Sequence, residues 1–178
     1  MFEETSPEWW LPRLAVKLRE QARLVTGNED WYYGRHPLPE ANASDKKLFE
    51  LFQSMSRSNY VAKVVDAPAD RLAVMGVQVG DDEASKAAWA SWRRSALDSD
   101  QGMLMTNAMA GGIAYLSVWP DETNEPLFAP EHGAQVTHIL VPGSLRKVAA
   151  ALKVYPDFLT EQLRVEMYLP DFICRWQV

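Results

Sequence analysis

The chain has 178 residues, of which 47% are hydrophobic and 24% are charged, and its formal net charge is −6. This length and composition predict one folded domain with a sizeable core, or such a domain with an appended arm, and argue against a disordered chain. Because no Lys/Arg cluster forms a stripe that neutralises several phosphates, tight binding of nucleic acid by this chain is disfavoured.

The rest of the composition disfavours several kinds of site. No apolar run approaches the roughly 20 residues of a membrane span, so no membrane association is expected. Cys174 is the only cysteine, which rules out an internal disulfide and fits a reducing cytoplasm. The histidines, His36, His132 and His138, lack the spacing of zinc ligands, so neither a metal nor a cofactor is expected.

Residues 1–42 predict one helix followed by an aromatic and proline-rich arm. Ser6-Pro7-Glu8 is a helix start signal, apolar residues then recur at helical spacing, and Gly27-Asn28 marks the expected end near residue 26. The segment Trp31-Tyr-Tyr-Gly-Arg-His-Pro-Leu-Pro39 is expected to be a connector that runs on to Asn42.

Residues 43–112 are expected to form a helical part. Ser44 is a candidate cap for a helix whose apolar positions are Leu48, Leu51, Phe52 and Met55. Asn59 is the expected N-cap of the next helix, and Asp66 is a candidate second cap before Pro68. The pattern then changes to a short strand over 73–79. The helix that Asn59 caps is expected to bury its apolar face, which consists of Val61, Val64, Val65, Pro68 and Leu72.

Two more helices are expected before residue 113. Asp81-Asp82-Glu83 places negative charge at the N-terminus of the first, where the helix dipole favours it. That helix is expected to run to about Leu97, with its inward side formed by Ala88, Trp89, Trp92 and Ala96. Asp98 or Ser99 is the expected cap of the second helix, and Gly111-Gly112 is its expected end.

From Ile113 the pattern changes to strands. Ile113–Trp119 is almost wholly apolar, which predicts a strand covered on both faces, and residues 120–124 predict a turn. Further strands are expected at 135–141, 147–154, 163–168 and 172–176, with a turn at Pro142-Gly143. Helices followed by a mostly antiparallel β meander over 113–178 define an α+β fold. Because the last residues lie within a strand pattern, we expect the chain to be the front part of a longer protein.

No group of residues has the pattern of an enzyme site. Cys174 and His138 are a candidate nucleophile and base, but a lone cysteine in an alternating strand is more often a small packed side chain. Asp66, Asp70 and Arg71 suggest an acid pair with a basic clamp, although helix capping and a surface salt bridge explain them as well. A non-enzymatic protein is therefore expected.

Two other patterns have simple structural explanations. Gly111-Gly112 has no Gly-Lys-Ser/Thr or Gly-x-Gly-x-x-Gly around it, so a helix end explains it better than a phosphate cradle. Asp121, Glu122 and Glu125 are more typical of a solvated turn than of a cation site.

Aromatic residues crowd the first 33 positions and flank the apolar stripe of the first helix. Either the arm that carries them folds back onto its own domain, or it anchors a neighbouring subunit, because Trp and Tyr are enriched at interface hot spots. The candidate subunit interface consists of Trp9, Trp10, Trp31, Tyr32 and Tyr33.

Landmarks along nearly the whole chain resemble the N-terminal part of portal proteins of long-tailed phages, especially those of actinobacterial hosts. In order they are Trp31-Tyr-Tyr-Gly-Arg-His-Pro-Leu-Pro39, Asn59 through Leu72, Trp92-Arg-Arg-Ser-Ala-Leu-Asp98, Gly112-Ile-Ala-Tyr-Leu-Ser-Val-Trp-Pro-Asp121, Ala151-Leu-Lys-Val-Tyr155 and Tyr168-Leu-Pro-Asp171. Ser95 stands where the family more often has Asn, and Val141 where it has an acidic residue; both departures are expected to weaken local hydrogen bonds. The motif positions expected to shape the fold are Asn59, Asp66, Arg71, Trp92, Gly112, Tyr115 and Asp171.

The resemblance implies a structural protein of the virion, made in the cytoplasm of a bacterial host, that forms a ring, usually of twelve subunits, at one capsid vertex. Terminase pumps DNA in through such a ring, and the DNA later leaves into the tail; the head–tail adaptor, scaffold and capsid proteins are the other implied partners. This chain would be the wing portion, without stem and clip, and no catalytic residue is carried over. An acidic chain suits a conduit that must not bind phosphate tightly. The alternative is a stand-alone α+β interaction module of a phage head or head–tail connector.

Overall fold

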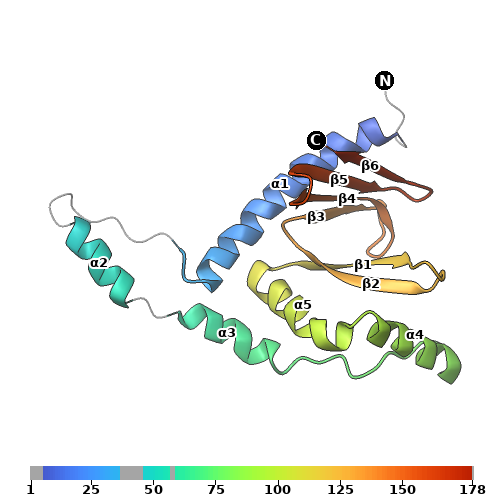
Figure 1. The fold of residues 1–178 in the computed structure, drawn as a ribbon, viewed down its shortest axis with the longest axis horizontal. Helices are drawn as coiled ribbons and strands as arrows, with labels where there is room; N and C mark the ends of the chain where they lie inside the picture. The colour runs from blue at the N-terminus through green and yellow to red at the C-terminus, as the bar shows by residue number, and fades with distance from the viewer. Residues whose placement is uncertain (1–5, 37–45, 57–58, 178) are drawn as a thin grey trace.

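The fold is seen in a computed structural model, which describes residues 6–36, 46–56 and 59–177. Within these ranges five helices precede two antiparallel sheets, so the predicted α+β class is confirmed (Figure 1). The helices are α1 (Pro7–Tyr32), α2 (Lys46–Ser56), α3 (Tyr60–Ala69), α4 (Asp82–Arg94) and α5 (Leu97–Gly111). The strands are β1 (Ala114–Pro120), β2 (Pro126–His132), β3 (Val136–Leu140), β4 (Val148–Asp157), β5 (Gln162–Tyr168) and β6 (Ile173–Gln177).

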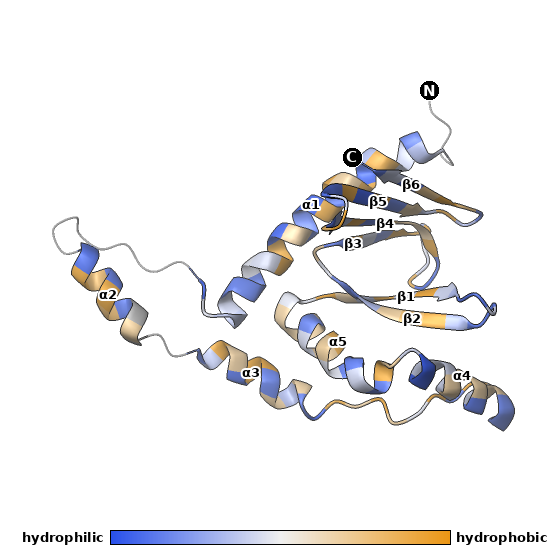
Figure 2. Ribbon diagram, in the orientation of Figure 1, coloured by the Kyte–Doolittle hydropathy of each residue, from blue (hydrophilic) through white to orange (hydrophobic). Residues whose placement is uncertain are grey.

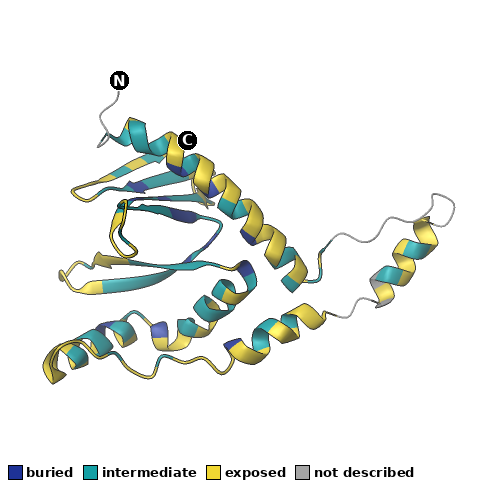
Figure 3. Ribbon diagram, turned by 180° about the vertical axis from the view of Figure 1, so that it is seen from behind, coloured by how far each residue is buried: buried dark blue, intermediate teal, exposed yellow. Residues whose placement is uncertain are grey.

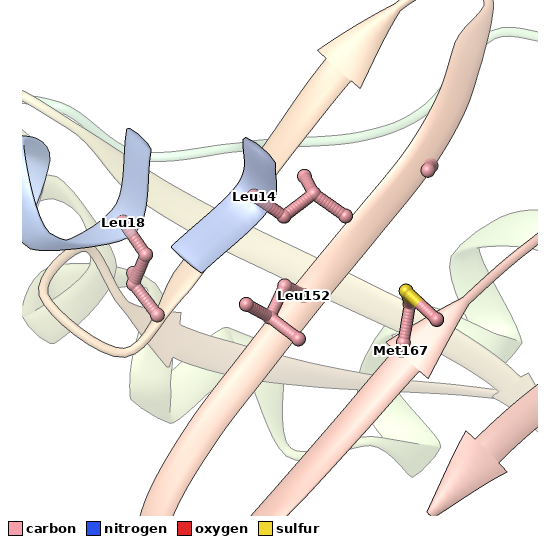
Figure 4. Packing of buried hydrophobic residues seen from close by; sticks show 5 residues of the cluster. Leu14, Leu18, Leu152 and Met167 are labelled. Carbon is pink, nitrogen blue, oxygen red and sulfur yellow. The ribbon is translucent and has the colours of Figure 1, made fainter. Parts of the chain in front are cut away.

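The larger sheet is a four-stranded antiparallel meander in the order β3-β4-β5-β6, as the alternating pattern predicts. Its register aligns Leu152 of β4 with Met167 of β5, and Met167 with Cys174 of β6. These residues lie on the face that α1 crosses, where Leu14 and Leu18 of α1 pack against Leu152 and Met167 (Figure 4). Four of the cluster's five side chains are between 0% and 1% exposed, so the main core lies between α1 and this sheet.

The helix α1 does not end at Gly27, as the sequence predicts, but continues to Tyr32. Gly27 has open space around the position of a Cβ atom and ordinary helical backbone there. On either side of it, Asn28 donates a hydrogen bond of 3.2 Å to the Gly111 carbonyl, and Val25 approaches the position of a Gly111 Cβ to within 3.0 Å. These contacts with the end of α5 stabilise the extra turns, so the packing outweighs the cost of a helical glycine.

The helix α3 begins as predicted, since the Asn59 side chain accepts a hydrogen bond from the backbone N–H of Ala62. The predicted apolar face is wrong, because Val64 is 72% exposed and the buried residue is Ala69. The predicted strand over 73–79 is also wrong; these residues are irregular. The Val74 N–H donates to the Gln101 side chain, so this backbone group is satisfied without a neighbouring strand.

The helices α4 and α5 meet at Arg94 to Leu97, earlier than predicted. The acidic residues Asp82 and Glu83 lie in the first turn of α4, as expected, and Asp81 caps the helix by accepting from the N–H of Ala84. Ala96 has a left-handed backbone, with φ of 56°, and precedes α5 without a side-chain cap, so the expected caps Asp98 and Ser99 are wrong. Because of this turn, Ala96 is exposed rather than inward. Gly112 ends α5 in the left-handed region, as predicted.

The strand β2, which the sequence did not predict, pairs with β1 in a separate two-stranded sheet. Pro126 and Pro130 lie in it, and a strand with one unpaired edge tolerates residues that lack an N–H. Because the sheet has only two strands, β1 is not covered throughout: Val118 is 56% exposed and Trp119 is 40% exposed. The expectation of a strand covered on both faces is therefore wrong for its second half.

Candidate subunit interface

The candidate nucleophile and base lie apart. Cys174 belongs to β6 and faces the core, whereas His138 belongs to β3, with β4 and β5 between them. The register places them on opposite faces, because His138 aligns with Ala151 and Tyr168, and Cys174 with Met167. Burial lowers the pKa of His138, and its ring meets the edge of Tyr115 at 5.5 Å. In the described part of the chain no three His, Cys, Asp or Glu side chains gather as metal ligands would.

Trp9 and Trp10 lie in the first turn of α1, which Ser6 caps by accepting a hydrogen bond from the Trp9 N–H. Their rings meet edge to face at 4.6 Å, and the Arg13 guanidinium lies 3.7 Å from the Trp9 ring centre. Trp10 packs against the core cluster between α1 and the sheet. The packing gives Trp10 a function within its own chain, and its role between subunits stays a prediction.

The second aromatic group lies at the other end of α1 and is more open. Trp31 is 50% exposed and stacks on His36 with ring centres 4.3 Å apart. Tyr33 is 57% exposed, and the Arg35 guanidinium lies 4.8 Å from its ring centre. Large aromatic rings that remain half exposed are a common feature of binding surfaces, so this end of α1 is the better candidate of the two.

Tyr32 lies between these two residues in the sequence, and its ring meets that of Tyr33 edge to face at 4.9 Å. Its hydroxyl donates a hydrogen bond of 2.8 Å to Asp66 of α3, and its carbonyl accepts one of 2.5 Å from the Asn59 side chain. The bond to Asp66, together with burial, raises the pKa of Tyr32 to about 12. Asp66 therefore does not cap α3, as the sequence suggested, but ties α3 to α1.

A polar contact that the sequence does not signal joins α1 to both sheets. The Gln21 amide donates to the carbonyl oxygens of Gly133 and Val136 at 2.5 and 2.6 Å. Its oxygen accepts hydrogen bonds from Tyr115 of β1 at 3.1 Å and from Thr137 of β3 at 3.0 Å. Four partners from three segments meet one side chain, so Gln21 sets how α1 sits on the β-rich half. A glutamine on an amphipathic helix is common, and nothing in the local pattern distinguishes this one.

The sheets are also joined by charged groups. Glu131 of β2 is 8% exposed and accepts hydrogen bonds of 2.6 Å from both Lys153 of β4 and Ser117 of β1. Glu29 of α1 lies 2.6 Å from the ring nitrogen of His132. These contacts connect β1, β2 and β4 to one another and α1 to β2.

Two comparisons with known proteins agree on the family. The profile of the family described as phage portal protein, SPP1 Gp6-like, matches residues 15–178. The chain belongs to this family. It is also 27% identical over 167 residues to the portal protein of Mycobacterium phage L5, in an alignment covering 88% of this chain and 34% of that protein. The chain thus spans about a third of that relative's length. Proteins of the portal family are structural components of phages rather than enzymes.

Several motif residues of this portal-family chain make contacts within the chain or end a helix. Tyr115 reaches Gln21, and Gly112 ends α5 with φ of 86°. Trp92 of α4 lies near Trp89 and Phe128, with ring centres 6.3 and 6.5 Å away. Arg71 and Asp171 are exposed at chain turns. Ser95, the departure from the usual Asn, accepts from the Phe128 N–H at 3.0 Å and donates to the Ser91 carbonyl at 2.8 Å.

The acidic turn of this portal-family chain is partly neutralised from within. Arg94 of α4 lies 3.9 Å from Asp121 and 3.6 Å from Glu125. Asp121 also accepts hydrogen bonds from the Thr123 hydroxyl and from the backbone N–H of Thr123 and Glu125, which holds its pKa below its usual value. This arrangement is the solvated turn that the sequence favours. Among the helices that the structure describes, none has the length and apolar character to cross a membrane.

Proposed function

We propose that this chain is part of a portal subunit, which assembles into a ring at one capsid vertex through which phage DNA is packaged and ejected. The observation that carries the proposal is the family match, which extends over residues 15–178. The family's usual twelve-subunit ring is the proposed assembly. Its location is the virion, after synthesis in the cytoplasm of the bacterial host.

The chemistry of the chain supports this proposal. The formal charge of −6, with eight acidic and three basic residues in 81–130, disfavours tight binding to DNA that passes nearby. Polar side chains such as Gln21 and Glu131 form hydrogen bonds between helices and strands of the same chain. A wall built from copies needs such a rigid body more than it needs a reactive group.

The proposed partners follow from the same assignment. Terminase, the head–tail adaptor, scaffold and capsid proteins are expected to meet the assembled ring, and DNA is expected to pass without sequence-specific binding. The division into an arm (1–42), a helical part (43–112) and a β-rich part (113–178) of the wing is likewise part of the proposal. The motif residues Asn59, Asp66, Arg71, Trp92, Gly112, Tyr115 and Asp171 are proposed to maintain the shape of that wing.

The proposal is tested in the phage or prophage that carries the gene. An epitope tag on the protein should be found by immunogold electron microscopy at a single vertex, the one joined to the tail. Disruption of the gene should leave heads without DNA. Labelling over the whole capsid, or normal DNA-filled particles after disruption, would refute the proposed function.

The exposed aromatic group gives a second test. If Trp31 packs between subunits, Trp31→Ala should lower the association state of the protein while its unfolding temperature changes little, because the ring is half exposed in the single chain. Trp10→Ala is the comparison variant, since Trp10 contacts the core and should lower the unfolding temperature instead. If Trp31→Ala instead lowers the unfolding temperature more than the association state, Trp31 packs within its own domain.

The alternative, a stand-alone α+β interaction module of a phage head or connector, predicts a monomer or small oligomer in light scattering and label at a position other than the portal vertex. A hydrolase based on Cys174 has less support, because its side chain faces the core and His138 lies on the other face of the sheet. A hydrolase activity of the protein that is lost in Cys174→Ala would support this alternative.

A further inference from the structure

The helix α2 exposes a continuous apolar stripe. Leu48, Phe52 and Met55 are 72%, 68% and 81% exposed, and Leu51 beside them is 57% exposed. These four residues, which we call the α2 stripe, recur at spacings of three and four and therefore share one side of the helix. Figure 1 shows α2 apart from the rest of the fold, Figure 2 shows its hydrophobic residues, and Figure 3 shows how much of it is exposed.

The next helix along the chain, α3, also exposes large apolar side chains. It is tied to α1 through Tyr32 and Asp66, and its Ala69 is 3% exposed. Tyr60 and Val64 of the same helix are 70% and 72% exposed.

A complementary surface lies on the opposite side of the same molecule. Figure 1 shows α2 at one side and the turn between β1 and β2 at the other. Beside that turn Val118 and Trp119 are exposed, and the turn carries Asp121, Glu122 and Glu125. The first turn of α2 carries Lys46 and Lys47 and no acidic residue. Apolar groups flanked by positive charge thus match apolar groups flanked by negative charge.

We propose that the α2 stripe docks on a second copy of this chain, against the edge formed by Val118, Trp119 and the acidic β1–β2 turn. Because the two surfaces lie on opposite sides of one molecule, each copy has one of each to offer, and the contact repeats head to tail. Head-to-tail contacts of this kind close into rings when the rotation permits. The inference rests on the proposed portal function and names the surfaces through which neighbouring copies would meet.

The contact is tested by cross-linking two differently tagged forms of the full 178-residue chain, both in a Cys174→Ala background. One form carries Phe52→Cys and the other carries Val118→Cys, and a short bis-maleimide joins cysteines that lie close. We expect a product carrying both tags. The matched control is Glu50→Cys, on the side of α2 away from the stripe, which should give little of this product. A product no stronger than the control overturns the proposal, and so does a link formed mainly within one copy when both cysteines are placed in one chain.

Sedimentation velocity supplies the energetic test. Phe52→Ser should raise the dissociation constant of self-association about tenfold or more, since a buried Phe side chain is lost from the contact. Glu50→Ser on the same helix should leave it nearly unchanged. Lys47→Glu should weaken association, and Glu122→Lys on the partner surface should restore it. Equal effects of Phe52→Ser and Glu50→Ser, or a fall in unfolding temperature without loss of association, would show that α2 packs on its own chain.

The two proposals fail separately. A tagged protein at the portal vertex without cross-linking between α2 and the β1–β2 edge leaves the portal function standing and removes this contact. Cross-linking with the label elsewhere in the virion leaves the contact standing and removes the portal function.

Discussion

Replacing Gln21 with methionine tests whether one polar side chain sets the position of α1. Methionine has nearly the same length but neither donates nor accepts the four hydrogen bonds made by the Gln21 amide. Thr137 is 0% exposed, so its hydroxyl has little access to water after the change. Each buried polar group left without a partner costs about 1–3 kcal/mol. Since the hydroxyls of Tyr115 and Thr137 also contact each other, part of the cost is recovered. We expect a loss of about 2–4 kcal/mol in the free energy of unfolding.

Urea denaturation followed by circular dichroism measures this loss, and the unfolding temperature should fall by roughly 5–15 °C for a chain of this size. The matched control is Glu20→Met, one position earlier in α1 and exposed, which should change the free energy of unfolding by less than about 0.5 kcal/mol. If Gln21→Met behaves like Glu20→Met, the network does not hold α1 in place, and the reasoning about the junction of the two sheets is refuted.

Three further predictions concern single contacts. Tyr32→Phe removes the hydrogen bond to Asp66 and should lower the free energy of unfolding by about 0.5–1.5 kcal/mol. Because folding raises the pKa of Tyr32 to about 12, this stabilisation should be present below pH 10 and be lost as the pH rises toward 12. Ala96→Gly should stabilise the chain by about 0.5–1 kcal/mol in the same assay, since Ala96 has φ of 56°; a loss of stability would contradict the strain. Arg164, 2.8 Å from Asp157, lowers the pKa of that carboxyl to about 2. Asp157→Asn should therefore reduce the loss of stability between pH 4 and pH 2 in an acid titration. An unchanged pH profile would show that this ion pair does not contribute to stability.

The sequence predicts the β meander well because its signals are local. Ala150 and Leu152 are two positions apart in this strand and share one face, and the structure buries both at 1% exposure. The turn at Gly143, with φ of 79°, separates two of these strands as predicted. Side chains of one face and turn residues lie within a few positions of each other, so a short window of sequence contains most of the information.

The errors occur where distant residues decide the outcome. Gly27 is a good helix stop by itself, but Asn28 and Val25 find partners at Gly111, more than 80 residues away. Residues 73–79 have strand-like composition, but the N–H of Val74 is satisfied by the Gln101 side chain. Local propensity differs by about 1 kcal/mol or less per residue, which a few tertiary contacts readily exceed.

The candidate interface shows the same division. That the region is rich in Trp and Tyr is plain from the sequence, but the pattern does not separate Trp10, which packs on the core, from Trp31, which is half exposed. Tyr32 and Tyr33 are neighbours, yet one binds Asp66 and the other faces solvent. Gln21 carries no local signal at all. Which aromatic rings remain available to a partner therefore depends on the course of α1 beyond Gly27, and this course is set by contacts with α3 and α5.

Amphipathic pattern alone also fails to say what covers a helix. In α1 the stripe with Leu14 and Leu18 is covered by β4 and β5, which follow it by more than 120 residues in the same chain. The stripe of α2 has the same spacing and remains exposed. Both patterns satisfy the physical need to remove apolar surface from water, and both predict a buried face. The sheet that meets α1 belongs to its own chain, whereas Leu48, Phe52 and Met55 of α2 are between 68% and 81% exposed. The proposed contact between copies of this chain would remove the exposed residues of α2 from water in the same way. The substitution Phe52→Ser tests that contact directly.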